Sequence, residues 1–558
     1  MDTLTSGNSI KWLNAFVVLA VLLNFSGLFI PIMAPDGALY AGIAKTMVLH
    51  NNYTDLFAEG RDWLDKPHFP FWIIAISFKC FGFTTWAYKL PAILFLLMGA
   101  RYTYLFAKSL YNTEIALWAV LILLTAEHII ISNNDVRAEP YLTGLIIASV
   151  CHFYQAYIAK NWWNLLAGSI FAACAIMTKG MFAIIPIGGA IAGELIIKKQ
   201  WKELFNLRWL VAAMLIAIFI IPELYCLYQQ FDLHPEKVMF GHTHVSGIRF
   251  FFWDSQFGRF LNTGPIKGHG DPTFFIHTTL WAFLPWSLLL FVAIFQYFKK
   301  YGKQARQIER FCICGSLLTF LIFSASRFQL PFYLNIVFPF FAILTAQYLY
   351  TVKGEKTINA IRITQRIIIV LLLLLVVVLQ YFFRPQSLTI LTGLVLLILL
   401  AAMLLLPSRL GSKPYQKIAL STFLAACIVN VYLNLAFYPS LLKYQSGSEA
   451  ALWINDHNPQ NLPVVQCIHV NDYGYPLEFY LNQHLYTITE GGDGTMPPKP
   501  FLLYGYPENI DALKKAKGWQ VDSLKTFDRY WITRLKPKFL NQKTRATMLE
   551  HVEVVEVR

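Results

Sequence analysis

The segment 12–33, WLNAFVVLAVLLNFSGLFIPIM, runs into the polar stretch Pro35-Asp36-Gly37-Ala38-Leu39-Tyr40. A helix of about 20 apolar residues spans the roughly 30 Å hydrocarbon core of a bilayer, so this segment is long enough to cross a membrane. Asp36 would then emerge at the far membrane surface. Residues 38–50 mix apolar and polar side chains at helical spacing, which predicts a short helix lying in the membrane interface. Asp36 would precede its first turn, where an isolated carboxylate often serves only as a helix cap.

The composition is that of a multi-span membrane protein. The chain has 558 residues, of which 56% are hydrophobic and 14% charged, and its mean hydropathy is +0.48. A net charge of +14 would suit a nucleic-acid partner, but the Lys and Arg residues lie mostly in short loops between apolar segments, so no such partner is expected. The cysteines lie mostly in or beside apolar segments without a C-x-x-C pair, which predicts neither a disulfide framework nor a zinc ribbon.

Thirteen apolar segments are candidates for crossing the membrane. They lie at approximately 12–33, 86–108, 114–132, 140–159, 163–178, 181–198, 208–229, 274–298, 310–325, 330–350, 365–383, 388–406 and 417–437. Segment 69–83 is barely long enough to cross and begins at Pro67 and Pro70, so we interpret it as re-entrant or interfacial. The expected fold class is an α-helical polytopic membrane protein with about 13 transmembrane helices over residues 1–437 and outer-face loops at 34–85 and 230–273.

The basic residues orient these segments, because cytoplasmic loops carry an excess of Lys and Arg. With a cytoplasmic N-terminus, the cytoplasmic side carries 19 basic residues, whereas the short loops opposite carry only Arg137, Lys179, Arg327 and Arg384. This bias keeps segment 69–83 out of the crossing set. It also predicts that residues 438–558 lie outside the cytoplasm.

The outer face collects an unusual set of charges. Asp36, Lys66, Arg137 and Glu139 lie there, together with the long loop 230–273 and its histidines. Loop residues are polar in any protein, and this account explains single charges well. It explains poorly why several tight turns each keep one cation against the topological bias.

Such a set suits chemistry on a lipid-linked phosphate. Lys66, Arg137, Lys179 or Arg327 could bind phosphate oxygens, and a carboxylate could deprotonate an acceptor hydroxyl. No G-x-x-x-x-G-K-[ST] or G-x-G-x-x-G motif occurs, so no nucleotide is expected. The alternative function is a secondary transporter or flippase of a lipid-linked sugar, which would place its ionisable residues near mid-membrane.

Five motifs in order carry a family resemblance: Asp36-Gly-Ala-Leu-Tyr40, Lys66-Pro67-His68, Arg137-x-Glu139, Thr178-Lys179-Gly180 and Ser326-Arg327-x-x-Leu330-Pro331-x-Tyr333. With the soluble tail, they resemble the bacterial GT-C glycosyltransferases related to aminoarabinose transferase and protein mannosyltransferases. The resemblance covers essentially the whole chain, and the first 350 residues are the most specific. It implies an inverting glycosyltransferase of the bacterial inner (plasma) membrane.

The resemblance also implies roles for residues. Asp36 and Glu139 take the acidic catalytic positions, and the donor phosphate is expected at Lys66, Arg137, Lys179, Arg327 and Tyr40. Asp65 and His269 match positions that bind a divalent metal ion in the aminoarabinose branch. The implied partners are a polyprenyl-phosphate (undecaprenyl-phosphate) sugar donor, a lipid A, glycolipid, protein or glycan acceptor, and membrane lipid. The family often has Glu at the position of Gly37 and Lys at the position of Gln329. The missing carboxylate bears against a metal at Gly37. Arg327 would have to supply the positive charge that the lysine provides.

The tail 438–558 has a different composition and predicts a small extracytoplasmic α/β domain. Strands are expected at 464–470, 485–488 and 501–504, and helices at 448–457, 476–482 and 509–517. The tail offers no obvious nucleophile, phosphate loop or metal cluster. A structural or acceptor-recognition role is therefore expected for it.

Overall fold

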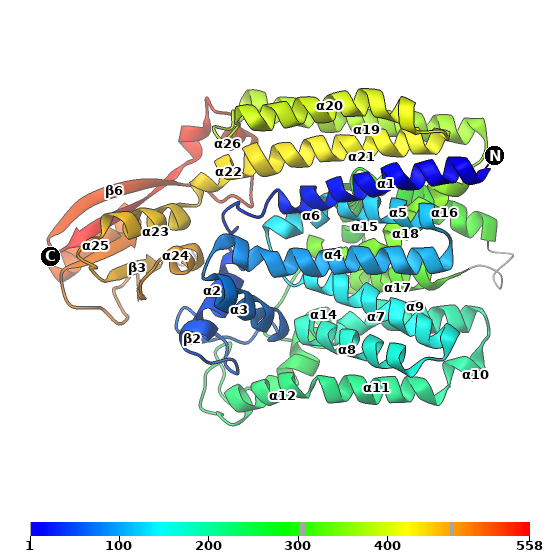
Figure 1. The fold of residues 1–558 in the computed structure, drawn as a ribbon. Helices are drawn as coiled ribbons and strands as arrows, with labels where there is room; N and C mark the ends of the chain where they lie inside the picture. Colours follow the sequence, from blue (N-terminus) through cyan, green and yellow to red (C-terminus); the bar gives the residue numbers. More distant parts are fainter. Residues whose placement is uncertain (1, 302–308, 469–473) are drawn as a thin grey trace.

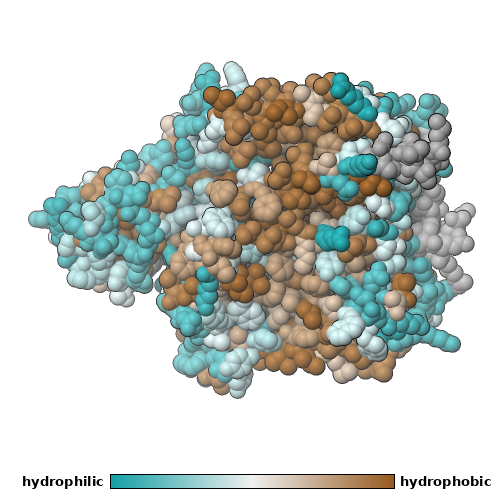
Figure 2. Space-filling view, viewed as in Figure 1, coloured by the Kyte–Doolittle hydropathy of each residue, from teal (hydrophilic) through white to brown (hydrophobic). Residues whose placement is uncertain are grey.

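The long apolar runs fold as helices because backbone N–H and C=O groups inside a bilayer must be satisfied within the segment itself. In the computed structural model, which describes residues 2–301, 309–468 and 474–558, these helices form one bundle with a small sheet domain at one end (Figure 1). Figure 2 shows a hydrophobic band across the visible face of the bundle, with more hydrophilic surface toward both ends. Lys303 and Arg306 of the counted basic residues, and the end of the strand expected at 464–470, lie outside the described residues.

The helices of the bundle follow the apolar segments closely. Their bounds are α1 (Asp2–Phe25), α2 (Asp36–Leu49), α3 (Phe69–Phe81), α4 (Thr85–Leu110), α5 (Thr113–Leu124), α6 (Glu127–Asn134), α7 (Glu139–Ala159), α8 (Trp162–Lys179), α9 (Ile184–Ile197), α10 (Trp201–Leu204), α11 (Leu207–Phe219), α12 (Ile221–Leu227), α13 (Gly247–Arg249), α14 (Arg259–Leu261), α15 (Phe274–Ala282), α16 (Ser287–Tyr301), α17 (Phe311–Ala325), α18 (Phe338–Thr351), α19 (Glu355–Phe382), α20 (Ile390–Leu410), α21 (Pro414–Tyr432) and α22 (Tyr438–Leu441). A π-helical segment, η3 (Phe250–Gly258), precedes α14, and a 3-10 segment, η4 (Pro331–Val337), leads into α18.

The predicted number of spans is not confirmed. Within the described part of the chain, seven helices are long and apolar enough to cross a membrane, or eight if α5 and α6, bent by 52° at their break, count as one span. Five shorter apolar helices accompany them, including α3. The predicted segment 274–298 is divided between α15 and α16, which shortens the continuous apolar helix, whereas segment 208–229 lies within one candidate span, Trp201–Asp232.

The first span ends earlier than predicted, at Phe25 rather than at residue 33. The buried Lys89 of α4 donates hydrogen bonds to the carbonyl oxygens of Gly27 (3.2 Å) and Ile30 (2.6 Å), which holds the chain in turns after α1. A Cβ at Gly27 would lie 1.8 Å from the Asn134 side-chain oxygen, so only glycine fits there. The segment that leads to Asp36 is therefore fastened against α4 and α6.

The tail folds as the expected small α/β domain, with more strands than predicted. Its five-stranded sheet has the order β4-β3-β5-β7-β6, in which β3 pairs in parallel with β4 and β5 while β7 is antiparallel to β5 and β6. The strands are β3 (Val464–Ile468), β4 (Leu485–Thr489), β5 (Phe501–Gly505), β6 (Val521–Arg529) and β7 (Glu550–Val557), and the helices α23 (Ser446–His457), α24 (Tyr475–Tyr480), α25 (Pro507–Lys517) and α26 (Pro537–Leu540). Separate apolar clusters, one with Ile454 and Leu477 and the other with Ile510 and Leu513, include residues of the sheet.

The tail is docked on the helix that begins with Asp36. Lys45 of α2 donates hydrogen bonds to the carbonyl oxygens of Glu478 (3.1 Å), Phe479 (2.8 Å) and Leu481 (2.8 Å) at the end of α24. These carbonyls have no partner further along a helix, so a cation at this end suits them. The Tyr480 hydroxyl accepts a hydrogen bond from the Ile32 amide at 2.8 Å. The sheet domain and the loop before Asp36 therefore share one set of contacts.

Candidate active site

Asp36 and Arg137 form an ion pair at the end of the bundle nearest the tail. Asp36 is the first residue of α2, and Pro35 before it makes no side-chain capping bond. The carboxylate of Asp36 instead accepts from the Arg137 guanidinium, which also donates to Asp135 at 2.9 Å and 2.8 Å. Asp36 is 38% exposed, whereas Arg137 is 16% exposed. The capping interpretation of Asp36 therefore does not describe this contact, and its carboxylate remains accessible.

Glu139 and Lys179 form a second pair, which joins the start of α7 to the end of α8. Glu139 is 1% exposed, and its second carboxylate oxygen has no hydrogen-bond partner in the described part of the chain. The Lys179 ammonium also lies 3.8 Å from the ring centroid of Tyr333, and the Arg137 guanidinium lies 4.4 Å from that of Phe332. Aromatic faces stabilise such cations. The two aromatic residues of η4 therefore hold both cations at the same place.

Asp65 brings two further cations together. Its carboxylate accepts from Lys66 at 2.5 Å and also from Arg259 of α14. Arg259 lies in the long loop 230–273, far from residue 65 in the sequence, and is 12% exposed. The pairing draws that loop over the end of the bundle and places Lys66 and Arg259 side by side.

A cavity with about 730 Å³ of empty space opens beside these groups. Three cations, Lys66, Lys179 and Arg259, line it, and the carboxylate that lines it is Asp65. Its apolar walls include Leu142, Phe182, Phe260, Phe323, Phe328 and Ile336. A partly apolar chamber with an excess of positive charge suits an amphiphile that carries a phosphate.

The charge on Lys66 is sensitive to pH near neutrality. Burial lowers the pKa of the Lys66 ammonium to about 8, although the nearby carboxylates of Asp36 and Glu139 act in the opposite direction. Burial also lowers the pKa of Arg259. Lys66 is therefore still mainly protonated at pH 7, but it loses its charge within the range of ordinary assays.

A buried histidine positions Lys66. The ring of His68 lies 2.9 Å from a carboxylate oxygen of Glu223 in α12 and 3.0 Å from the Thr54 carbonyl oxygen, and both His68 and Glu223 are fully buried. The His68 amide donates to the other Glu223 oxygen at 2.9 Å. The Lys66-Pro67-His68 motif thus combines one residue of the cavity with an anchor that fastens the loop to α12.

Six of the nine predicted site residues do not line the cavity: Asp36, Arg137 and Glu139 lie in the two ion pairs described above, and Tyr40, Arg327 and His269 lie elsewhere. Tyr40 is buried at 6% exposure and packs edge-on against Trp63 and Phe71, so its ring supports α2 rather than lining the cavity. Arg327 is exposed, although its neighbours Ser326 and Phe328 line the cavity. His269 is exposed as well. Arg259, which was not predicted as a site residue, lines the cavity, whereas Arg327, which was expected to bind the donor phosphate, does not.

The backbone explains where Arg327 and His269 lie. Gly268 and Gly270 pack against the main chain of residues 326–328, and a Cβ at Gly270 would lie 2.2 Å from the Ser326 carbonyl oxygen. The Arg327 amide donates to the Phe260 carbonyl at 3.0 Å. The main chains of the two loops pack against each other. The side chains of Arg327 and His269 therefore lie on the exposed side of the loops.

The residues expected to bind a divalent metal do not form a ligand set. Among the described residues, no group of three or more His, Cys, Asp or Glu side chains converges to hold a metal ion. Asp65 is engaged by Lys66 and Arg259, whose positive charges oppose a cation there. The arrangement therefore does not fit the metal implied at Asp65 and His269.

Asp135, Arg259 and Glu223 are site residues that sequence reasoning did not select. Asp135 lies two residues before Arg137 in the sequence, so its proximity to that residue could have been inferred. Arg259 was visible only as one of several charges in loop 230–273. Glu223 appeared as a carboxylate near the outer end of an apolar segment, and such a residue needs a partner.

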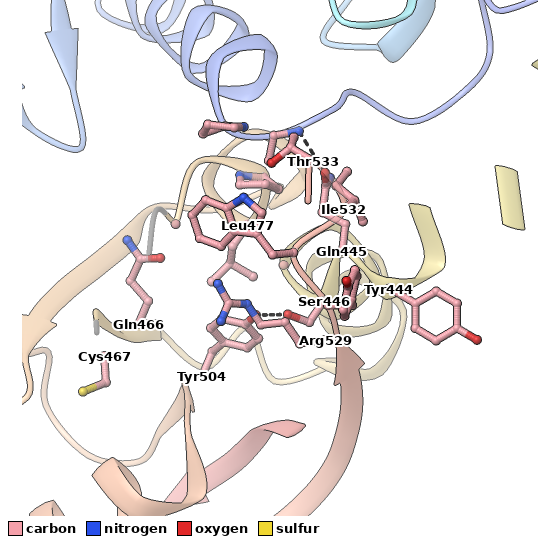
Figure 3. Close-up of a pocket in the computed structure, with 17 residues that line it drawn as sticks. Tyr444, Gln445, Ser446, Gln466, Cys467, Leu477, Tyr504, Arg529, Ile532 and Thr533 are labelled. Carbon is pink, nitrogen blue, oxygen red and sulfur yellow. Dashed lines mark hydrogen bonds between the residues drawn. The ribbon is translucent and has the colours of Figure 1, made fainter. Parts of the chain in front are cut away.

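A second cavity, with about 700 Å³ of empty space, lies between the tail and the loop before Asp36 (Figure 3). Ala34 and Pro35 form part of its lining, and Tyr504 and Arg529 contribute from the sheet. The side chain of Gln445 accepts from the Ala34 amide at 2.9 Å and donates to the Ile32 carbonyl at 2.9 Å. This polar and aromatic cavity therefore opens one residue away from Asp36, on the side of the tail.

Comparison with known proteins agrees with this geometry. A family model described as dolichyl-phosphate-mannose-protein mannosyltransferase matches residues 65–225. An undecaprenyl phosphate-alpha-4-amino-4-deoxy-L-arabinose arabinosyl transferase from Proteus mirabilis is 27% identical over 338 residues, 59% of this chain and 57% of the relative. An uncharacterized protein from Aquifex aeolicus is 23% identical over 355 residues, 62% of this chain and 66% of the relative. The match thus spans less than two thirds of the length of these relatives.

The fold itself is matched over almost the entire chain. The crystal structure of ArnT from Cupriavidus metallidurans bound to undecaprenyl phosphate has a TM-score of 0.72 at 16% identity, with 98% of both chains covered. The apo structure of the same protein has a TM-score of 0.71 at 17% identity. These matches confirm the GT-C-like membrane fold with a small C-terminal sheet domain. The sequence match above confirms the resemblance to aminoarabinose transferases.

Proposed function

We propose that this chain is an integral-membrane glycosyltransferase, which moves a sugar from a polyprenyl-phosphate-linked donor to an acceptor at the membrane face that carries Asp36. The observation that carries the proposal is the cavity in which Lys66, Lys179 and Arg259 converge beside two carboxylate-bearing loops. The likeness to transferases named for an undecaprenyl-phosphate sugar supports the same class of donor. A lipid-linked donor also suits a cavity whose walls are largely apolar.

In the proposed reaction, Asp36 accepts the proton of an acceptor hydroxyl while that oxygen forms a bond to the anomeric carbon of the donor. The bond from the anomeric carbon to the phosphate oxygen breaks on the opposite face of the sugar, which inverts the anomeric configuration. The polyprenyl phosphate leaves with the bonding electron pair. Lys66, Lys179 and Arg259 stabilise the charge that develops on it. Arg137 holds the Asp36 carboxylate in place, and Glu139 orients Lys179.

The acceptor approaches from the side of the tail in this proposal. The cavity beside Pro35 connects the sheet domain to the start of α2 and offers aromatic and polar groups that suit a sugar or head group (Figure 3). The proposed acceptor is membrane-bound, such as lipid A or another glycolipid, in keeping with the acceptors that the family resemblance implies. A protein or a glycan acceptor is the other outcome of the assay below.

The proposed location is a bacterial inner membrane, with the N-terminus in the cytoplasm and the tail outside it. The uneven distribution of basic residues supports this orientation. An alkaline phosphatase reporter fused after Phe437 should be active, and one fused within 299–310 should be inactive. The reverse pattern would place the candidate active site in the cytoplasm and refute the orientation.

The decisive test of function uses the purified full chain in lipid nanodiscs with an undecaprenyl-phosphate-linked sugar and lipid A, glycolipid or peptide acceptors. Mass spectrometry should detect an acceptor heavier by one sugar and the release of undecaprenyl phosphate in equal amount. Movement of the intact donor across vesicle membranes without transfer would instead support the flippase alternative. Repeating the assay with EDTA, and then with divalent ions added back, tests the metal that the family resemblance implies.

A further inference from the structure

Residues of α19 and α21 line a separate cavity. Both helices begin at the end of the bundle opposite to α2 (Figure 1). The cavity has about 670 Å³ of empty space and is lined by Arg362, Gln365, Arg366, Ile369, Pro414, Lys417, Ile418 and Ser421. None of these residues belongs to the candidate active site. The cavity therefore needs an explanation of its own.

The lining of this cavity combines three cations with no carboxylate. Arg362 and Arg366 lie one turn apart on α19, and Lys417 lies on the first turn of α21. No ion pair of these three side chains occurs within the described residues, and Arg362 donates to the Asn359 side chain at 3.0 Å. An excess of positive charge therefore faces the cavity, which favours an anionic ligand.

Two other cations at the same end of the bundle have a carboxylate partner. Lys198 pairs with the buried Glu194, and Lys413 lies 3.9 Å from Glu114. Lys413, which is close to Lys417 in the sequence, thus has a carboxylate nearby, whereas the three cations that line the cavity have none among the described residues. A general bias of loops toward basic residues explains the presence of these cations, but it does not explain why they gather around an opening between two helices.

Gln365 supplies an independent indication of a ligand. Its side chain lines the cavity, is 1% exposed and accepts a hydrogen bond from Thr422 at 3.4 Å. Its amide nitrogen has no hydrogen-bond partner in the part of the chain that the structure describes. A buried donor without an acceptor is costly, so such groups usually face a ligand or water. An acceptor oxygen in the cavity would satisfy it.

The surroundings of the cavity are apolar on the membrane side. Ile369 and Ile418 line it beside the polar groups. Along the same stretch of α19, Ile363, Ile367 and Val370 are 59%, 55% and 61% exposed, as expected for side chains that contact lipid. The ligand should therefore be an amphiphile with an anionic head and hydrocarbon chains.

We propose that this cavity binds the phosphodiester head group of an anionic glycerophospholipid, whose acyl chains run along the exposed face of α19. The phosphate oxygens accept from Arg362, Arg366 and Lys417, and one oxygen accepts from the Gln365 amide. The lipid belongs to the leaflet opposite to the candidate active site. The proposal does not depend on the proposed transferase activity.

Native mass spectrometry of the detergent-purified full chain tests the site with phosphatidylglycerol and with phosphatidylethanolamine. The unaltered protein should retain phosphatidylglycerol preferentially. The triple variant Arg362→Gln, Arg366→Gln and Lys417→Gln should bind it about 100-fold more weakly, because each cation near an anionic lipid contributes about a factor of five. The single variant Gln365→Leu, which keeps the side-chain volume, should weaken retention several-fold and leave thermal stability unchanged or higher.

A matched control removes three other cations from the same end of the bundle, with Lys160→Gln, Lys356→Gln and Arg409→Gln. This variant has the same net charge as the first triple variant and should retain phosphatidylglycerol normally. If both triple variants lost phosphatidylglycerol retention equally, the effect would be general electrostatic attraction, and the proposed site would be refuted. Displacement of the lipid by millimolar inorganic phosphate would assign the cavity to a free phosphate instead. Unchanged binding in Gln365→Leu would also contradict the proposal.

Discussion

Replacing Asp36 by Asn separates its chemistry from its contribution to stability. Asparagine keeps the shape of the side chain and removes the proton acceptor. Asp36 is 38% exposed, and a partly exposed ion pair such as that with Arg137 contributes about 1 kcal/mol or less. The carboxylate in the first turn of α2 adds about 0.5 kcal/mol through the helix dipole. Arg137 retains Asp135 as a partner. We therefore expect a loss of about 1 to 2 kcal/mol in the free energy of unfolding and a protein that still folds.

The expected effect on catalysis is much larger. Loss of a positioned general base slows a reaction by about 10²-fold to 10⁴-fold, which corresponds to about 3 to 5 kcal/mol in the activation barrier. Binding of the anionic donor should stay the same or become tighter, because the substitution removes a negative charge near Lys66. Single-turnover transfer from a radiolabelled donor in nanodiscs measures the rate, and titration of the same donor measures its affinity.

The matched control is Asp135→Asn, which removes the other carboxylate partner of Arg137. If Asp36 merely holds Arg137, both variants should lose a similar amount of activity. If Asp36 is the base, only Asp36→Asn should lose 10²-fold or more. A loss below about tenfold in Asp36→Asn, at normal donor affinity, would refute the assignment and move the role to Glu139 or Asp65.

Three further predictions concern the cations. Because the pKa of Lys66 is lowered to about 8, kcat/KM for the donor should fall above about pH 8, and Lys66→Arg should move that limb to higher pH. Arg259→Gln should weaken donor binding about tenfold or more in equilibrium titration, because its guanidinium lines the cavity, whereas Arg327→Gln should change it less than twofold. Lys45→Met should destabilise the docking of the tail by about 2 kcal/mol, since three carbonyl oxygens lose a charged donor, and limited proteolysis should release the tail faster.

Deprotonation of Lys66 at high pH does not destabilise the folded protein, so unfolding caused by this group would not explain a loss of activity there. The folded-state pKa of Lys66, about 8, lies below the value of 10.5 for an ordinary lysine. Between these values the unfolded chain binds more protons than the folded chain, so this group makes the protein more stable as pH rises. A fall in thermal stability over the same range would trace the loss to another group. Equal effects of Arg259→Gln and Arg327→Gln would contradict the position of Arg259 in the cavity.

Local patterns in the sequence predicted much of the fold because they report on short stretches of chain. The helix expected at 38–50 begins two residues earlier, and the strands expected from 485 and 501 were correct. Strand β6 was missed because most of its side chains are exposed and no alternation of buried residues marks it. Strand β7 was missed although its alternation of Glu and Val carried a signal. The end of α1 depends on Lys89, a residue about 60 positions away, which local periodicity does not reveal.

The candidate site, like the fold, was predicted only in part from the sequence. Lys66, Arg137, Glu139 and Lys179 lie in or beside tight turns on one side of the bundle, so alternation of the loops predicted that they would meet. Arg259 required the path of a long loop, which is set by its pairing with Asp65 and by the packing of distant glycines. Such long-range contacts are invisible to spacing and charge counts.

The docking of the tail through main-chain carbonyls has a consequence for how proteins of this fold diverge. A carbonyl oxygen is present whatever side chain the residue carries, so the three acceptors that Lys45 contacts survive almost any substitution in the tail. Apart from side chains that also contact the loop before Asp36, such as Tyr480 and Gln445, the sequence of the tail is then free to change with the acceptor, provided that a helix still ends at this place. Exchange of whole tails between relatives should succeed where the recipient keeps a lysine at the position of Lys45 and the new tail keeps the side-chain contacts made by Tyr480 and Gln445.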